Sequence, residues 1–363
     1  MLEPVSDYPF LKPEFLSALE DSGSATAATG WEPRHLSSVD GALFMPLYVK
    51  THSYGEYVFD WVWANAYHRS GLAYYPKLVT AIPFSPITGP RLRLAAGADS
   101  ERTATALLAA VAEAAEATGA SSWHLLFPDT ATREILRGHG LLERSGVQFH
   151  WHNQGYENFE HFLAGLASRK RKMMRRERST VVDQGLTVAM LEGPAIDADL
   201  WSFFHGLYQN TYAKRSGNGG YLTPDFFRRI GATLAHQIAM AVAYDAGKPV
   251  AAALYFHDGE TLYGRYWGCV REYECLHFEL CCYQGIDYAI RRGLTKFDAG
   301  AQGEHKIARG FAPVETWSLH WIRHRGFATA IADFLERERG HNQEYMAAAR
   351  AQLPYRQDSQ RES

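Results

Sequence analysis

The sequence predicts an α/β fold with mixed sheets, built from two halves that repeat one order of elements. In each half a helix ends at a glycine, Gly119 or Gly293, and a short strand follows. Glycine at this position is typical of helix C-caps, because it adopts the left-handed conformation without strain. An order of strand, helix and strand that occurs twice favours an α/β architecture.

The first half contains an apolar run over residues 41–49, which predicts a buried strand. An alanine-rich helix is predicted over 103–118, a strand over 122–127, a short helix over 132–137 and a last strand over 147–152.

The second half begins with a predicted β-hairpin, whose strands 241–244 and 250–256 flank a turn that contains Gly247. A strand over 262–267 completes this meander. The remaining predicted elements are a helix over 278–292, strands over 296–298 and 317–322, and a helix over 328–337.

The length and composition are typical of a globular chain with two domains, since 363 residues are too many for one small hydrophobic core and 46% of them are hydrophobic. We expect a first domain over 1–155 with an aromatic insertion near 51–85, a basic helical connector over 156–185, a second domain over 186–348 that carries the main site, and a polar tail over 349–363.

Charge and cysteine usage narrow the class of protein. A net charge of −3 argues against wholesale nucleic-acid binding. No apolar run reaches membrane-spanning length, the start does not resemble a signal peptide, and the cysteines cluster in one short segment. We therefore expect a cytoplasmic protein with reduced thiols and no membrane insertion. The cysteine and histidine spacings match no familiar zinc module, so no metal is expected.

The segment 265–311 mixes aromatics, glycines and several kinds of ionisable side chain, which is typical of a pocket for a polar ligand. Three catalytic candidates stand out. Glu279 is a candidate general base, provided that burial raises its pKa. His305 and Lys306 follow a glycine-punctuated turn, where they could bind an anion or polarise a carbonyl.

The substrate-binding candidates in this segment are Arg265, Trp267, Tyr283, Gln302, Glu304 and Arg309. The alternatives to these functional interpretations are a surface turn around Lys306 and a helix that buries its cysteines and pairs its glutamate, Glu279.

The stretch from Arg169 to Arg178 contains seven basic residues in ten positions, on a helix that Ser168 could N-cap. The alternative interpretation is a solvated face. The functional interpretation is a site that binds the phosphate of a nucleotide, a phosphosugar or a tRNA backbone. Its predicted phosphate-binding residues are Arg169, Lys170, Arg171 and Arg175.

The aromatic insertion is too apolar to lie free in water, so we expect it to form a wall of the ligand site. Its candidate substrate-binding residues are His52, Tyr54, Glu56, Tyr75 and Lys77. The alternative is a packed edge segment whose polar groups pair with one another.

Four motifs carry a resemblance that covers nearly the whole chain. They are His52-Ser-Tyr-Gly-Glu-Tyr-Val-Phe-Asp-Trp61, Tyr74-Tyr-Pro-Lys77, Leu276-His-Phe-Glu279 and Gly300-Ala-Gln-Gly-Glu-His-Lys306. The chain resembles the FemAB-like predicted N-acyltransferases, a peptidoglycan biosynthesis/recognition family related to the Fem transferases and to the GNAT acyltransferases. The resemblance implies two tandem GNAT-like domains with mixed sheets. Lys306 with Phe311 resembles the lysine and aromatic residue of the Fem active-site loop.

The implied activity is an N-acyltransferase that moves an acyl or aminoacyl group onto a small-molecule amine acceptor, linked to cell-wall precursors. No glycine-paired pyrophosphate loop precedes the second-half helix, so acyl-CoA and aminoacyl-tRNA both stay open as donor substrates. No tightly bound cofactor is expected. The alternative function is a non-catalytic binding protein for a cell-wall precursor or phosphosugar.

Overall fold

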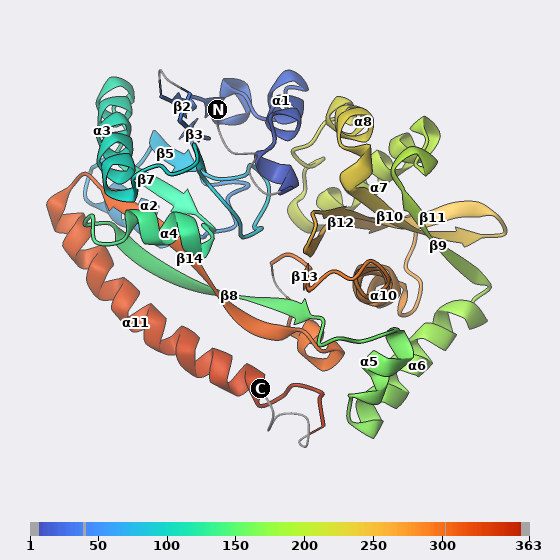
Figure 1. Ribbon diagram of the computed structural model, residues 1–363. Helices are drawn as coiled ribbons and strands as arrows, with labels where there is room; N and C mark the ends of the chain where they lie inside the picture. Colours follow the sequence, from blue (N-terminus) through green and yellow to red (C-terminus); the bar gives the residue numbers. More distant parts are fainter. Residues whose placement is uncertain (1–6, 39–40, 302, 357–363) are drawn as a thin grey trace. The chain divides into compact units, whose positions relative to one another are not determined.

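The computed structural model describes residues 7–38, 41–301 and 303–356 (Figure 1). The chain divides into two compact units. Unit 1 reaches Val147 and resumes over Glu315–Tyr345, and unit 2 consists of Gln148–Val314 and the residues from Met346 onward.

Unit 1 contains a mixed sheet in the order β1-β4-β5-β7-β14. These strands are β1 (Trp31–Pro33), β4 (Tyr48–Lys50), β5 (Lys77–Thr80), β7 (Ser122–Leu126) and β14 (Ala312–Ile322). β5 and β7 are parallel, and the other neighbours are antiparallel. A smaller sheet joins β2 (Leu36–Ser37), β3 (Leu43–Met45) and β6 (Arg93–Leu94).

The helices of unit 1 include short 3-10 turns and five longer segments. They are η1 (Pro9–Leu11), α1 (Pro13–Asp21), η2 (Ala27–Thr29), α2 (Trp61–Arg69), α3 (Ser100–Thr118), α4 (Thr130–Leu136) and α11 (Arg325–Arg350), whose last residues belong to unit 2. Asp99 caps α3 by accepting from the Arg102 amide at 2.7 Å, and Gly119 ends it in the left-handed conformation. The buried face of α3, with Leu107 and Val111, joins Trp123 in one core.

Unit 2 contains a mixed sheet in the order β8-β13-β12-β11-β10-β9. Its strands are β8 (Leu142–His152), β9 (Leu186–Glu192), β10 (Ile238–Asp245), β11 (Lys248–His257), β12 (Thr261–Cys269) and β13 (Lys296–Asp298). Only β12 and β13 are parallel to each other. The predicted hairpin is therefore present as β10 and β11.

Helices lie on both faces of the unit 2 sheet, with α7 and α8 on one face and α10 on the other (Figure 1). The helical segments are α5 (Phe159–Ala164), α6 (Ser168–Asp183), η3 (Gly193–Ala195), α7 (Ala198–Ser216), α8 (Pro224–Thr233), η4 (Ala235–Gln237), α9 (Leu276–Phe278), the π-helical turn η5 (Glu279–Tyr283), α10 (Gln284–Arg291) and η6 (Glu304–Arg309). A core around Tyr255, Ile286 and Phe297 joins α10 to the sheet.

The last strand of each half of the sequence pairs with a strand from the other half. β8 ends the first half, and its residues 150–152 pair with β13 in unit 2. β14 ends the second half, and its residues 318–322 pair with β7 in unit 1. The stretch Glu315–Tyr345, predicted as part of the second domain, therefore belongs to unit 1.

Several local expectations differ from the structure. The apolar run 41–49 is divided at Pro46 into β3 and β4, because proline cannot donate a ladder hydrogen bond. The basic helix is N-capped by Ala167, and no side chain caps it, so Ser168 already lies inside the helix. A backbone hydrogen bond of 2.8 Å from Ala167 to Pro354 fixes the chain just before α6. β9, α2, α7 and α8 were not predicted.

The contact between α7 and β12 gives a testable prediction about stability. A Cβ on Gly268 of β12 would lie 2.5 Å from the carbonyl oxygen of Leu207 in α7, so Gly268→Ala must push the helix away from the sheet. We expect this change to lower the free energy of unfolding by about 1–3 kcal/mol in urea denaturation. The matched control is Gly206→Ala in α7, where nothing lies within 4 Å of the added Cβ. The control should raise stability by roughly 1 kcal/mol, and equal effects of the two changes would contradict the packing argument.

Candidate active site

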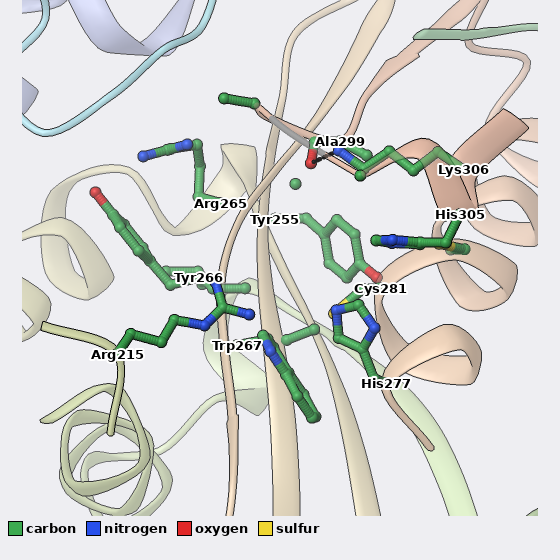
Figure 2. Close-up of a pocket in the computed structure, with 16 residues that line it drawn as sticks. Arg215, Tyr255, Arg265, Tyr266, Trp267, His277, Cys281, Ala299, His305 and Lys306 are labelled. Carbon is green, nitrogen blue, oxygen red and sulfur yellow. Dashed lines mark hydrogen bonds between the residues drawn. The ribbon is translucent and has the colours of Figure 1, made fainter. Parts of the chain in front are cut away.

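The candidate site lies where two parallel strands of unit 2 diverge. β12 pairs with β13 only between residues 261–263 and 296–298. Beyond these residues, a cavity of about 390 Å³ is lined by Gly264–Trp267 on one side and by Ala299, Ala301 and Gly303 on the other (Figure 2). The strands that form the sheet therefore also position the walls of the cavity.

A β-bulge places several consecutive residues of β12 on the cavity. Leu254 of β11 pairs with Tyr266, but the next residue, Tyr255, pairs with Gly264, so Arg265 is the extra residue. A bulge bends its strand and redirects side chains. As a result Gly264, Arg265, Tyr266 and Trp267 all line the cavity, which strict alternation would not allow.

The π-helical turn η5 brings two neighbouring thiols, Cys281 and Cys282, to the cavity. Tyr255 stabilises this turn by donating its hydroxyl to the Leu280 carbonyl. Burial raises the pKa of Cys281 well above its usual range and that of Cys282 to about 11. Both side chains are therefore protonated thiols near neutral pH rather than thiolates.

Lys306 closes the turn that follows β13. Its buried Nζ donates to the carbonyls of Ala299 at 2.9 Å and Gly300 at 2.8 Å, leaving a third ammonium proton for another acceptor. The chain can make this turn because Gly300 and Gly303 have φ angles of 76° and 111°, which favour glycine. Burial lowers the pKa of Lys306, since desolvation disfavours the ammonium.

Two imidazoles line the same cavity, with ring centroids 5.6 Å apart. Burial lowers the pKa of His277 to about 4, and the positive charges of Arg215 and Lys306 act in the same direction. The pKa of His305 is lowered too, first by desolvation and then by Lys306. Both rings are therefore neutral near pH 7 and able to accept a proton.

The charge on the cavity wall has one sign. Arg215, Arg265 and Lys306 are its cations, and none of the described residues that line it is Asp or Glu. In a partly desolvated site this arrangement favours an anionic ligand, because an anion compensates the buried positive charge.

Four of the residues predicted from the sequence meet at this cavity: Arg265, Trp267, His305 and Lys306. Gln302 lies outside the described residues, and Glu304 is exposed and does not line the cavity.

Sequence reasoning missed Arg215, Tyr255 and His277, which also line the cavity. His277 stands in a motif that the sequence singled out, so its place beside Glu279 was an available signal. Arg215 comes from α7 and had no such signal.

Glu279 is not among the residues that line the cavity, and its predicted role as a base stays a prediction. Its carboxylate accepts from Arg178 at 3.0 and 3.1 Å and from Gln284 at 2.7 Å. The π-helical turn explains the difference, because it places residues five apart, such as Glu279 and Gln284, on one face. In a regular α-helix Glu279 would share its face with Tyr283 instead.

Arg309 and Tyr283 also lie outside the cavity lining and hold its loop in place. Arg309 donates twice to Glu177 at 2.8 Å, to the Tyr283 hydroxyl at 3.0 Å and to the His305 carbonyl at 2.8 Å. Its guanidinium lies 3.4 Å from the ring centroid of Phe278. This network links α6 to η6 and holds the His305 backbone in place, while ligand binding by Arg309 stays a prediction.

The basic helix α6 uses part of its charge in such internal pairs. Arg175 pairs with Glu160 at 2.5 Å, and Arg178 pairs with Glu279. Arg169 is exposed, while Lys170 and Arg171 are partly exposed. Phosphate binding by this helix stays a prediction.

The candidates in the insertion lie in unit 1, where several form a buried polar network. Lys77 donates to Glu56 at 2.7 Å, to Ser53 at 2.8 Å and to Asp60. Burial raises the pKa of Glu56 to about 7, although Lys77 acts in the opposite direction. Burial alone would lower the pKa of Lys77, but Glu56 and Asp60 outweigh it and raise that pKa.

The other three insertion candidates are more accessible. Tyr54 is 55% exposed, and His52 and Tyr75 are partly exposed. The Tyr75 hydroxyl lies 2.8 Å from Ser53, and a ring nitrogen of His52 lies 3.1 Å from the Thr29 carbonyl. Glu56 and Lys77 therefore match the alternative stated for this segment, in which its polar groups pair with one another.

Within residues 7–38, 41–301 and 303–356 no helix is both long and apolar enough to cross a membrane. In the same ranges no three His, Cys, Asp or Glu side chains are arranged to hold a metal ion.

Comparison with known proteins gives a family match and several structural similarities. Residues 2–357 match the model of the FemAB-like family, described as peptidoglycan biosynthesis/recognition. Comparison with curated protein sequences gives no match.

Three solved structures show the same fold. FemX has a TM-score of 0.53 and 13% identity, with 91% of this chain and 95% of FemX covered. L-PGS from Bacillus licheniformis has a TM-score of 0.53 and 12% identity, with 92% and 99% covered. The C-terminal domain of a putative lysylphosphatidylglycerol synthetase from Agrobacterium fabrum has a TM-score of 0.51 and 13% identity, with 87% and 96% covered. These similarities, together with the mixed sheets and helices of both units, confirm the predicted α/β fold class.

The buried network of unit 1 gives a second prediction about stability. Lys77→Met removes the ammonium that compensates Glu56 and Asp60, so it should lower the free energy of unfolding by about 3–5 kcal/mol. Adding Glu56→Gln and Asp60→Asn should restore part of this loss. The control is Arg137→Met, which breaks an exposed pair with Glu134 (57% and 48% exposed) and should change stability by less than about 0.5 kcal/mol. A loss from Lys77→Met no larger than that of the control would contradict the account.

Proposed function

The chain belongs to the FemAB-like family of peptidoglycan biosynthesis and recognition, and we propose that it is a transferase that moves an acyl or aminoacyl group from an activated donor to an amine acceptor. The reaction site of this proposal is the cavity of unit 2. The family description supports acceptors among peptidoglycan precursors, and the name of the lysylphosphatidylglycerol synthetase supports acceptors among lipids.

The observation that carries the proposal is the combination of neutral imidazoles with three cations, of which Lys306 is buried, on one cavity wall. An amine acceptor is protonated near pH 7 and must lose a proton before it can attack a carbonyl. His277 and His305 are neutral and can take that proton. A binding protein needs only complementarity to its ligand, whereas poised bases are what a transfer reaction requires.

The proposed step is direct attack of the amine on the donor carbonyl. The ammonium loses one proton to an imidazole, which releases it to solvent. As the nitrogen then forms a bond to the carbonyl carbon, it gives a second proton to the imidazole, and the carbonyl oxygen gains negative charge. Lys306 and Arg265 stabilise this charge electrostatically. The bond to the leaving group then breaks, and the thiolate of CoA or the ribose oxygen of tRNA takes a proton from the imidazolium.

The state of the thiols supports direct transfer over an acyl-cysteine intermediate. A cysteine nucleophile reacts as the thiolate, and such residues have a lowered pKa. Cys281 and Cys282 have raised pKa values instead. They therefore shape the wall and are not part of the proposed transfer.

One further role belongs to the same proposal. The exposed cations of α6, with Arg169 and Lys170, would hold phosphates of the donor. A role of His52, Tyr54 and Tyr75 of unit 1 in recognising the acceptor stays a prediction.

The experiment that tests the proposed function supplies both donor classes. Purified protein is incubated with acyl-CoA thioesters or with mixed aminoacyl-tRNA, together with a nucleotide-linked muramyl peptide or phosphatidylglycerol, and products are identified by mass spectrometry. A new amide on the muramyl peptide supports the proposed transfer to an amine, whereas an ester on phosphatidylglycerol alone would contradict the amine acceptor. A tRNA donor adds a steep loss of activity with salt, which a CoA donor does not. Tight precursor binding without product from any donor would overturn the transferase in favour of a binding protein.

Lys306 gives the first prediction for the assay. Lys306→Met should lower kcat roughly 10²–10³-fold, because it removes a donor to the developing oxyanion. Its melting temperature should fall by only a few degrees, since water can reach the freed carbonyls at the cavity wall. The matched control is Lys296→Met at the start of β13, which does not line the cavity and should keep near-normal activity. A collapse of stability equal to the loss of activity would make Lys306 structural.

The imidazoles predict the pH dependence of the reaction. A group with a lowered pKa keeps its neutral form to lower pH, so the acid limb of kcat/KM should lie well below 6.5. With His277 as the base the limb should fall near its pKa of about 4. His277→Gln should then lower the plateau and move the limb, while an acid limb at 6.5 in the unmodified enzyme would exclude both imidazoles as bases.

A further inference from the structure

A second cavity of about 430 Å³ adjoins the first in unit 2. It is formed by the last turns of α7, with Asn210 and Lys214, and by the end of β12 with Cys269 and the loop residue Glu272. Neither the sequence motifs nor the proposed reaction assigns a role to this space.

The two cavities share one wall. Arg215, Trp267 and His277 line both of them, and Figure 2 shows these three side chains together at one end of the first cavity. The rings of Trp267 and His277 have centroids 4.7 Å apart. A group bound in either cavity therefore meets the same imidazole.

The shared wall also holds an unsatisfied donor. Among the described residues, the buried indole N–H of Trp267 has no hydrogen-bond partner. A buried donor without a partner is costly, so such a group is expected to bind a ligand or water.

The second cavity differs from the first in charge. Its wall carries Lys214 and Glu272 as well as Arg215, so both signs are present. Burial raises the pKa of Cys269, Lys214 lowers it and Glu272 raises it, which places both charges near one sulfur. Within the described ranges, neither Lys214 nor Glu272 forms an ion pair with another side chain.

We propose that the second cavity binds the amine acceptor as a zwitterion, that is, an amino-acid or peptide amine with a nearby carboxylate. Glu272 binds the ammonium, and Lys214 with Arg215 binds the carboxylate. The first cavity, whose wall is only cationic, then takes the anionic donor. This assignment rests on the proposed transferase function.

The shared wall gives the geometry of transfer. The ammonium gives one proton to His277, which releases it to solvent. The nitrogen then forms a bond to the donor carbonyl carbon that reaches the wall from the first cavity, and His277 takes the second proton from the nitrogen. The carbon–sulfur or carbon–oxygen bond of the donor breaks, and the leaving group takes the proton from His277. Neither an oxidant nor a metal is needed for this balance.

The test uses three probes of equal chain length on the full protein: γ-aminobutyrate, butylamine and butyrate. Their dissociation constants are measured by ligand-observed NMR titration near pH 7.5, and that of inorganic pyrophosphate by calorimetry. We expect γ-aminobutyrate to bind about tenfold more tightly than either singly charged probe, because it makes both charge-assisted contacts. Equal affinity of the three probes would overturn the proposal.

Two variants locate the binding. Asn210→Trp places a large side chain in the second cavity from an exposed helix position, so it should abolish γ-aminobutyrate binding and leave pyrophosphate affinity within twofold. Gln209→Trp is the matched control, since residue 209 is exposed on the same helix and lines neither cavity. Glu272→Gln should remove the preference of γ-aminobutyrate over butyrate. Unchanged γ-aminobutyrate binding in Asn210→Trp, or an equal loss in Gln209→Trp, would contradict the assignment.

These binding measurements distinguish failure of the proposed acceptor site from failure of the proposed transferase function. Zwitterion selectivity that disappears in Asn210→Trp establishes the site even if no donor yields a product. Transfer activity that is unchanged in Asn210→Trp would overturn the acceptor site while leaving the transferase in place.

Discussion

The divergence of β12 and β13 is the constraint on which the site depends. The two strands are parallel neighbours over three residue pairs and then separate, which leaves part of β12 without a partner on that side. The gap persists because Lys306 reaches back across the turn to the carbonyls of Ala299 and Gly300. The bulge at Arg265 and the π-helical turn η5 then direct side chains into the opened space.

Desolvation of positive charge connects this geometry to chemistry. A buried ammonium and two imidazoles share a wall on which no described residue is a carboxylate, so each protonated group disfavours the others. His277 and His305 respond by staying neutral, which is the state a base requires. An anionic ligand would offset the remaining charge. The free site is therefore less stable electrostatically than the occupied one, an arrangement that favours binding of an anionic donor.

The parts of the fold that local chemistry determines were predictable. Gly119 and Gly293 end their helices in the left-handed conformation, and the hairpin around Gly247 forms as its turn residues indicate. The pairing of β8 with β13 and of β14 with β7 was not predictable, because these strands are far apart in sequence and packing of the folded chain selects their partners. For the same reason Arg215 was missed, and the π-helical turn moved Glu279 away from a face that regular helical spacing assigned to it.

The most direct test of the central claim is a histidine-selective ¹⁵N NMR titration of His277, with and without inorganic pyrophosphate. In the free protein, the pKa of His277 should be close to its value of about 4. Because an anion in the cation-lined cavity favours the imidazolium, pyrophosphate should raise that pKa. A pKa near 6.5 in the free protein, or one that pyrophosphate leaves unchanged, would contradict the claim that desolvated positive charge prepares this cavity for an anionic donor and a neutral base.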